Sequence, residues 1–404
     1  MKKEIDEGNV GELLVSDFFD KNFSKIYSFP NPKTKNNSEV ADVLIWLNRT
    51  VFLIEVKTRS MDGTAPIESW AHTQIKKAYT QINKNFQRIK SKEEIFLKNA
   101  YYDTKLDCEE VVQIIGLVIL VSEEKCIVEP TEYLSEIYAN DAIPIHVITW
   151  DNLELMLDEI DTVPDFIYYL QDRFQYLKIS NIPTGKELDV LGYYKSQSNK
   201  FPKVAFDFTI SWKEYKTTMQ TNILIRNQHN TYSQSLDKLE EQFIFQRKLY
   251  DGIPLGMYFA WELGTLSRRE KAYYGEKINS VFEYFSKEKN SRKFSVQSGG
   301  TKNWLLFHFS KSSEKINSIE LERLCKLKLV KEMHLNSFEF GVYAFAFEVS
   351  DTYPYQIMSI ITTIMMGVDV VTDMYNQENI ELALKEFGDE KSYFKLPIKE
   401  FIEV

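Results

Sequence analysis

The sequence predicts an α/β protein of two domains, and three observations lead to this expectation. Its 404 residues are more than one compact core normally holds. Its main apolar segments in the first half are continuous rather than alternating runs, which is typical of strands buried on both faces. Between these runs, apolar residues recur every three or four positions, as in helices that cover a sheet.

The first element is expected to be a helix, because its apolar residues recur at helical spacing and form one face. These residues are Val10, Leu13, Leu14, Phe18 and Phe19. The polar stretch from Pro30 to Glu39 predicts a loop. Two β-branched runs, 40–47 and 51–56, are joined by a short polar turn and predict a β-hairpin.

Helical spacing returns after the hairpin, and then buried strands follow. A helix is expected over 68–89, strands over 111–121 and 145–150, and a further helix with Asp151 as its N-cap. Beyond the linker candidate at 180–187, strands are expected over 204–212, 303–310 and 340–349, and helices over 233–251, 268–289, 319–334 and 380–387. No internal repeat is visible in the sequence. Residues 1–178 and 186–404 are therefore the expected domains, the second of α/β or α+β type with no assignable role.

Composition narrows the class of protein. The net charge is −10, which does not favour indiscriminate binding to phosphates, although residues 182–331 hold 25 Lys and Arg against 16 Asp and Glu. The three cysteines and five histidines are scattered, so neither a disulfide framework nor a zinc site is expected. The apolar run Ile357–Val371 is too short to span a bilayer and predicts a buried helix. No membrane association and a cytoplasmic location are expected.

Charged residues inside the predicted hairpin are the main functional signal. Glu55 and Lys57 are two apart in a strand and share a face, and the hairpin can bring Asp42 near them. Two carboxylates and an ammonium are costly in a sealed core, whereas a cleft that holds a hard cation accommodates them. Mg²⁺ prefers one or two carboxylates with water and a phosphate, so Asp42 and Glu55 are candidate ligands. Mn²⁺ is the expected substitute.

This pattern, AD followed by EVK, resembles the PD-(D/E)XK superfamily of restriction-endonuclease-like nucleases, in its Mrr-like or a related bacterial branch. The resemblance covers about residues 1–177 and implies a mixed central sheet flanked by helices. It implies a metal site at Asp42 and Glu55, with Lys57 catalytic. Glu12 on the first helix matches the helical acid of such enzymes, as a further catalytic residue and metal ligand. Ala41 replaces the family's proline before the aspartate, a frequent change that leaves activity possible.

The helix after the lysine matches an element on which several of these families carry a polar site residue. Gln74 and Gln81 are seven apart and share a side, so either or both are catalytic candidates. Basic residues nominated for nucleic-acid binding are Lys77, Lys84, Arg88, Arg268 and Arg269. For the last two, an amphipathic helix with buried aromatic residues is the favoured alternative. The segment around Gly299 lacks the spacing of a phosphate-binding loop, so ATP binding is not expected.

The sequence therefore predicts a Mg²⁺-dependent deoxyribonuclease, an endonuclease rather than an exonuclease. By analogy with such enzymes it would act in restriction or anti-phage defence, as a homo-oligomer or with a partner protein of a defence system. One alternative is a catalytically silent module that reuses the nuclease fold to bind nucleic acid or form a complex. Another is an RNA-directed or structure-specific nuclease.

Overall fold

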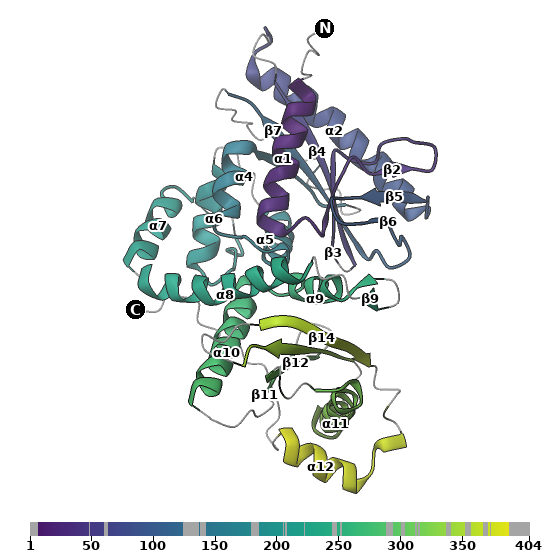
Figure 1. The fold of residues 1–404 in the computed structure, drawn as a ribbon. Helices are drawn as coiled ribbons and strands as arrows, with labels where there is room; N and C mark the ends of the chain where they lie inside the picture. Colours follow the sequence, from purple (N-terminus) through teal and green to yellow (C-terminus); the bar gives the residue numbers. More distant parts are fainter. Residues whose placement is uncertain are drawn as a thin grey trace. The chain divides into compact units, whose positions relative to one another are not determined.

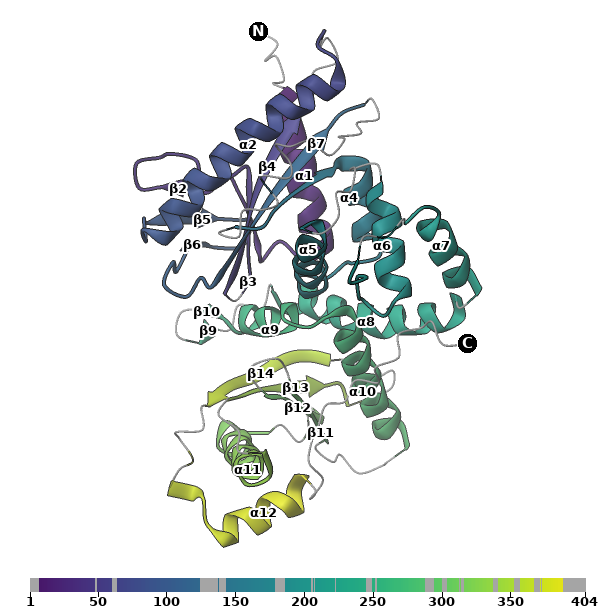
Figure 2. The ribbon, with the colours of Figure 1, turned by 180° about the vertical axis from the view of Figure 1, so that it is seen from behind.

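The structure, a computed structural model, describes residues 7–47, 49–59, 64–123, 137, 143–178, 186–204, 206, 208–221, 223–244, 249–250, 253–287, 294–299, 304–311, 313, 316–336, 341–351, 357–366, 371 and 373–387. Contacts divide the chain into two compact units, Met1–Leu224 with Lys399–Val404, and Ile225–Ile398 (Figures 1 and 2). Among the described residues, no helix is long and apolar enough to cross a membrane.

A five-stranded mixed sheet is the centre of the first unit, as predicted. Its strands are ordered β1-β3-β4-β7-β8, with β1 and β3 antiparallel, β3 and β4 antiparallel, and β4, β7 and β8 parallel. Their bounds are Ser28–Pro30, Val43–Leu47, Thr50–Thr58, Gln113–Val121 and Ile145–Thr149. The β3–β4 hairpin and the two apolar parallel strands were all expected from their residue patterns. A mixed α/β fold is therefore confirmed for this part of the chain.

Helices α1 (Glu7–Phe23) and α2 (Ile67–Lys90) cover opposite faces of this sheet (Figures 1 and 2). Ala71, Ile75 and Ala78 of α2 pack on the face that carries Leu44 and Leu53. The opposite face carries Phe52, which stacks on Phe166 of α5 (Val163–Leu177), and Phe166 in turn contacts Phe23 of α1. The two helical layers follow from the alternation of side chains along β4.

The prediction for the apolar face of α1 is wrong in part. Val10, Leu13 and Leu14 are 48%, 62% and 43% exposed, whereas Val15 and Phe19 are buried. The helix instead turns Gly11 towards the sheet, where a Cβ atom would overlap the Oγ1 atom of Thr58 in β4. The rotation of α1 about its axis is therefore set by the close approach of Gly11 to β4, and not by its longest apolar stripe.

A small sheet and several helices complete the first unit. The predicted loop at 30–39 contributes β2 (Lys33–Thr34) to a sheet of order β2-β5-β6, with β5 at Ile95–Lys98 and β6 at Asp103–Lys105. Helix α4 (Trp150–Leu157) has Thr149 rather than Asp151 as its N-cap, so that prediction is wrong by two residues. Asp151 lies in the first turn, where a negative charge still favours the helix.

The first unit continues past the expected boundary at 178–186, because α6 (Glu187–Ser196) is anchored to α5. Arg173 and Glu187 are each 1% exposed and form a bidentate ion pair, with Nη2 and Oε2 2.6 Å apart. Tyr169 donates a hydrogen bond to the same carboxylate, and Nη1 of Arg173 lies 2.9 Å from Nδ1 of His146. Residues 180–185 of the predicted linker lie outside the described residues.

The strand predicted over 204–212 does not form. Helix α7 (Ser211–Thr221) occupies its end, and the preceding residues have no regular structure where they are described. The backbone N–H of Phe206 donates to the Tyr176 hydroxyl at 2.8 Å, and the rings of Phe206 and Phe208 pack on Tyr193. Aromatic packing on neighbouring helices therefore replaces pairing in a sheet.

The second unit is a three-layer arrangement around the sheet β11-β12-β13-β14. The strands are Phe294–Gly299, Trp304–Lys311, Val342–Val349 and Ile357–Met366; β12 and β13 are parallel and the other pairs antiparallel. Its helices are α8 (Ile223–Ile244), which begins in the first unit, α9 (Leu255–Gly264), α10 (Arg268–Lys287), α11 (Ser318–Asn336) and α12 (Gln377–Phe387). A two-stranded ribbon joins β9 (Leu249–Tyr250) to β10 (Ile253–Pro254).

The apolar run expected to form a buried helix at Ile357–Val371 begins instead with the strand β14. It pairs antiparallel with β13, from Val349 opposite Ile357 to Val342 opposite Met366. A short apolar run does not distinguish a helix from a strand, and the β-branched Ile and Thr residues of this run favour the strand. The hydrogen bonds supplied by β13 decide the outcome.

Candidate active site

The β3–β4 hairpin brings Asp42 opposite Glu55. Val43 pairs with Ile54, so Asp42, directly before β3, faces the next residue of β4. The backbone N–H of Asp42 donates to the carbonyl of Ile54 at 3.1 Å. The N–H of Val56 donates to Oδ2 of Asp42 at 2.6 Å. Both bonds come from the rigid ladder of the hairpin, so the position of this carboxylate is determined by the backbone.

Lys57 lies on the same face of β4 as Glu55, as the alternation predicted. Its Nζ atom is 2.9 Å from Oε2 of Glu55 and 3.7 Å from Oδ2 of Asp42. The side chains of Asp42, Glu55 and Lys57 are 10%, 3% and 14% exposed. The three groups named from the sequence are therefore one cluster, nearly buried but open to solvent at Lys57.

Burial makes this cluster electrostatically unusual. Burial, with the nearby charge of Asp42, raises the pKa of Glu55 from 4.5 to about 7 although Lys57 opposes the change. Burial likewise raises the pKa of Asp42, against the attraction of Lys57 and the hydrogen bond from Val56. Burial acts to lower the pKa of Lys57, but Glu55 and Asp42 outweigh it and leave that pKa raised. One ammonium thus compensates two carboxylates only in part.

Glu12 on α1 belongs to the surroundings of this cluster. Its carboxylate contributes to the raised pKa of Lys57, and the side chain is half-buried. The preceding residue is Gly11, whose lack of a side chain lets α1 approach Thr58, the neighbour of Lys57. The structure therefore brings the predicted helical acid to the lysine side of the cluster.

One residue of the polar flank of α2 contacts the segment that precedes Asp42. Arg88 donates from Nη1 to the carbonyl of Glu39 at 2.9 Å and to Oδ1 of Asn85 at 2.9 Å. Gln74 and Gln81 precede Arg88 at intervals of seven residues and so lie along the same flank. Gln74 is half-buried and Gln81 is exposed. Gln74 is therefore the more enclosed of the two candidates.

Glu39 is a site residue that was not predicted from the sequence. Its side chain hydrogen-bonds with Asp42, and burial together with the charge of Asp42 raises the pKa of Glu39. Its charge also acts on Glu55. The signal was available, since Glu39 is a third acid only three residues before Asp42 in the segment that enters β3. It lay in a stretch interpreted as loop.

The predicted nucleic-acid contacts divide into exposed and engaged side chains. Lys77 and Lys84 are exposed on α2. Arg88 bonds to Glu39 and Asn85 and also lies 3.5 Å from a carboxylate oxygen of Glu93. Only the two lysines are therefore well presented to a phosphate backbone.

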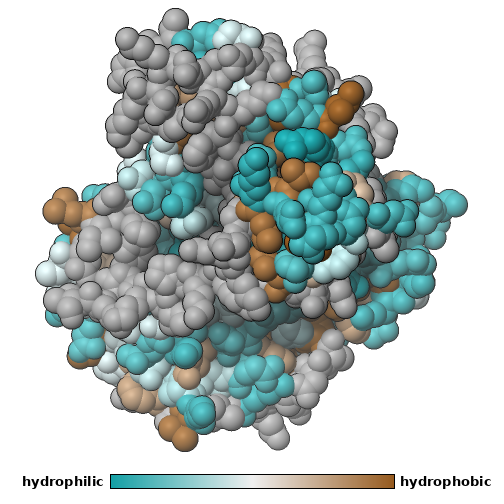
Figure 3. Space-filling model, turned by 90° about the horizontal axis from the view of Figure 1, so that it is seen from below, coloured by the Kyte–Doolittle hydropathy of each residue, from teal (hydrophilic) through white to brown (hydrophobic). Residues whose placement is uncertain are grey.

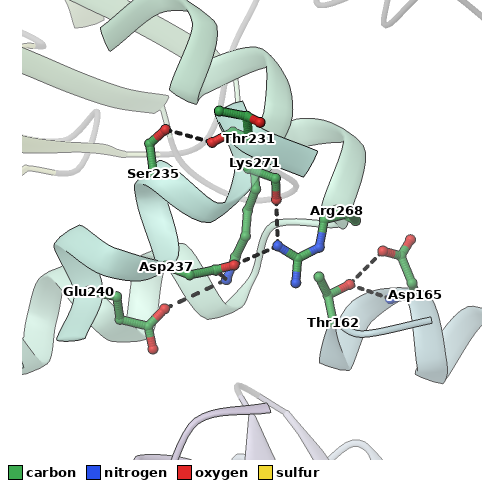
Figure 4. A network of polar contacts seen from close by, with 9 residues as sticks. Thr162, Asp165, Thr231, Ser235, Asp237, Glu240, Arg268 and Lys271 are labelled. Atoms are coloured by element: carbon green, nitrogen blue, oxygen red, sulfur yellow. Dashed lines mark hydrogen bonds and ion pairs between the residues drawn. The ribbon is translucent and has the colours of Figure 1, made fainter. Parts of the chain in front are cut away.

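In the second unit, Arg268 and Arg269 are partly buried on α10. Figure 4 shows Arg268 and Lys271 turned towards Asp237 of α8. Nη1 of Arg268 is 2.6 Å from the Ser233 hydroxyl, and Nζ of Lys271 is 2.7 Å from Asp237. Tyr274 of the same helix is fully buried. The alternative interpretation, an amphipathic helix with buried aromatic residues, fits these contacts.

A metal would have to bind through few protein ligands. Among the described residues, no group of three or more His, Cys, Asp or Glu side chains is arranged to hold a metal ion. Asp42 and Glu55 together supply two carboxylates, which is the number that Mg²⁺ uses when waters and a phosphate complete its shell. The raised pKa of both carboxyl groups means that burial disfavours their charged forms, and a bound cation would offset this effect. These two carboxylates therefore suit Mg²⁺ with water and phosphate as its other ligands. They are too few for a metal site built from protein ligands alone.

Comparisons with known proteins give little beyond this geometry. No protein-family model and no curated protein matches the sequence. Among solved structures, the small subunit of the heterodimeric restriction endonuclease R.BspD6I is similar, with 14% sequence identity and a TM-score of 0.28. The match covers 48% of this chain and 93% of that subunit. The chain therefore has a distant structural similarity to a restriction endonuclease subunit, too slight to assign a residue or an activity.

Proposed function

We propose that the first unit is a metal-dependent nuclease that hydrolyses phosphodiester bonds within DNA strands. The observation that carries the proposal is the arrangement of Asp42, Glu55 and Lys57 on one face of the β3–β4 hairpin. Two buried carboxylates next to one ammonium are costly for folding alone. Their position on one face of a hairpin of the central sheet favours a catalytic role.

Asp42 and Glu55 are the groups that would hold Mg²⁺, or Mn²⁺ in its place. When bound, the ion would supply positive charge that activates a water molecule and neutralises the phosphate. Lys57, released in part from Glu55, would orient that water or stabilise the charge of the transition state. Glu12 would hold Lys57 in place, and Gln74 or Gln81 would orient water or phosphate.

The test is incubation of the full chain with supercoiled plasmid and Mg²⁺ or Mn²⁺. Asp42→Ala and Lys57→Ala are each expected to lower cleavage at least a hundredfold, because each removes a group that would act in the transition state. Lys98→Ala is the matched control, since that lysine is exposed in the same unit and is expected to retain full activity. Cleavage that persists unchanged in the first two variants would contradict the site assignment.

One observation favours a second candidate, a catalytically silent module of the same fold. Lys57 already forms a 2.9 Å ion pair with Glu55, and the described residues hold no third ligand grouped for a metal. Under this alternative the cluster stabilises one conformation, and the chain binds nucleic acid or a partner without cutting. Absence of cleavage over varied DNA and RNA, with no difference between wild type and variants, would favour it. Cleavage of RNA or branched DNA alone would identify an RNA-directed or structure-specific nuclease.

Nucleic-acid contacts and biological setting extend the same proposal. Lys77 and Lys84 are the exposed basic residues that would contact phosphates, so binding should weaken steeply with salt, less so in Lys77→Ala/Lys84→Ala. Action in restriction or anti-phage defence, as a homo-oligomer or with a partner protein, is proposed by analogy with nucleases of this type.

A further inference from the structure

The second unit repeats the order and pairing of elements that builds the candidate site in the first. In the first unit, α1 precedes the hairpin β3–β4, and then α2 leads to β7, which pairs parallel with β4. Strands β1 and β2 are inserted between α1 and β3, and strands β5 and β6 between α2 and β7. In the second, α10 precedes the pair β11–β12, and then α11 leads to β13, which pairs parallel with β12. The second hairpin strand is central in both sheets.

The helices also cover the same faces in the two units. The helix before the hairpin packs on one face of the central strand: α1 approaches Thr58, and Tyr274 of α10 contacts Phe307. The helix after the hairpin packs on the other face: α2 covers Leu53, and α11 covers Leu306. The two units differ in the fourth strand, because β8 is parallel to β7 whereas β14 is antiparallel to β13.

This correspondence identifies where a second site would lie. In the first unit, Glu55 and Lys57 project from the central strand on the side of the second helix. On β12 that side carries Leu306, His308 and Ser310, because Leu305, Phe307 and Phe309 belong to the α10 side. None of these three described residues is a carboxylate or a lysine. Ser310 instead accepts a hydrogen bond from the N–H of Ile316 at 3.3 Å.

The remaining charges do not rebuild the cluster. Glu348 of β13, which pairs with Ser310, is the acid nearest in register. The residue directly before the hairpin, Asp42 in the first unit, is Lys293 in the sequence of the second. On α11, Lys328 and Glu332 are fully buried and form their own ion pair at 2.6 Å. On the face seen from below in Figure 3, the coloured surface is mostly hydrophilic, with small hydrophobic areas between hydrophilic side chains.

We propose that residues 268–349 are a second copy of the helix–hairpin–helix–strand core of the first unit, and that the described residues of this copy form no metal-binding or hydrolytic centre. Of the two copies, the described residues then place a centre only in the first, at Asp42 and Glu55. The assignment of that centre rests on the proposed function. The inference that the described residues of the second copy form no such centre rests on the side chains of that copy.

Binding of Mn²⁺ to the full chain, followed by electron paramagnetic resonance, tests this proposal. In Glu55→Gln the affinity for Mn²⁺ should fall at least tenfold, and plasmid cleavage should be lost. In Glu348→Gln, and in the exposed control Glu378→Gln, binding and cleavage should match wild type. Circular dichroism confirms that the variants fold.

A Mn²⁺ ion that remains in Glu55→Gln but is lost in Glu348→Gln would overturn the proposal, as would cleavage with the same dependence. If wild type binds no Mn²⁺ and cuts no nucleic acid, the proposed function fails. The same result agrees with the inference that the second copy has no metal-binding or hydrolytic centre among its described residues. The two proposals therefore fail on different results.

Discussion

Replacing Glu55 by glutamine is expected to make the metal-free protein more stable at alkaline pH while removing its activity. The structure buries this carboxyl with 3% of its side chain exposed, and its pKa is raised from 4.5 to about 7. A raised folded pKa favours the folded state at pH values below 4.5, and this contribution is lost as the pH rises through about 7. Glutamine keeps the shape and removes the ionisation.

The magnitude follows from that difference in pKa. At about 1.36 kcal/mol for each pKa unit, a gap of about 2.5 corresponds to about 3 kcal/mol, and about 2.5 kcal/mol of it falls between pH 5 and pH 8.5. The free energy of unfolding of Glu55→Gln, relative to wild type, should therefore rise by about 2.5 kcal/mol over this interval. The attraction of Lys57 is already contained in the pKa of about 7, so loss of this ion pair needs no separate correction.

The assay is hydrogen exchange of β4 and β7 peptides over a urea series with a chelator present. It reports on the first unit alone, which matters because a chain of two units need not unfold in one step. Glu68→Gln, an exposed carboxylate at the start of α2, is the matched control and should follow wild type. Parallel pH profiles for Glu55→Gln and wild type would refute the reasoning, because they would mean that Glu55 is not desolvated.

Three further predictions concern the scaffold of the site. Gly11→Ala should destabilise the first unit by about 1–3 kcal/mol, since its Cβ would overlap Oγ1 of Thr58, and Thr58→Ala should restore much of the loss in a double-mutant cycle. Arg173→Met should lower the free energy of unfolding in urea by about 3–5 kcal/mol, because it leaves Glu187 charged and buried without its partner. The double variant Arg173→Met/Glu187→Leu should recover most of this loss. Equal losses in the single and double variants would contradict the role of the buried pair. Burial and Arg173 hold the pKa of His146 well below 6.5, so stability should fall as the pH drops below about 6.5, and His146→Gln should flatten this dependence. If the free energy of unfolding of that variant fell with decreasing pH as in wild type, another group would be responsible for the pH dependence.

Local pattern predicted the first unit well where the residues of one segment decide its structure. The β3–β4 hairpin, helix α2 and both parallel strands β7 and β8 form as expected. Asp42, Glu55 and Lys57 meet because strand alternation and one short turn are enough to place them. Local pattern failed where contacts with residues far away in the sequence determine the structure. Ile357–Met366 is a strand because it pairs with β13. Phe206 packs on Tyr193 instead of entering a sheet.

The sequence by itself determined the chemistry of the candidate site, because its three charged groups lie within one hairpin. Only the tertiary structure decided what surrounds them: the rotation of α1 about Gly11, the placement of Glu39 beside Asp42, and the burial that raises the pKa of Glu55. It also placed α10, β11, β12, α11 and β13 in the order and pairing of the core of the first unit, which no repeat in the sequence indicates. Strand pairing and helix placement depend on contacts between residues far apart in the chain, and such contacts leave no periodic signal.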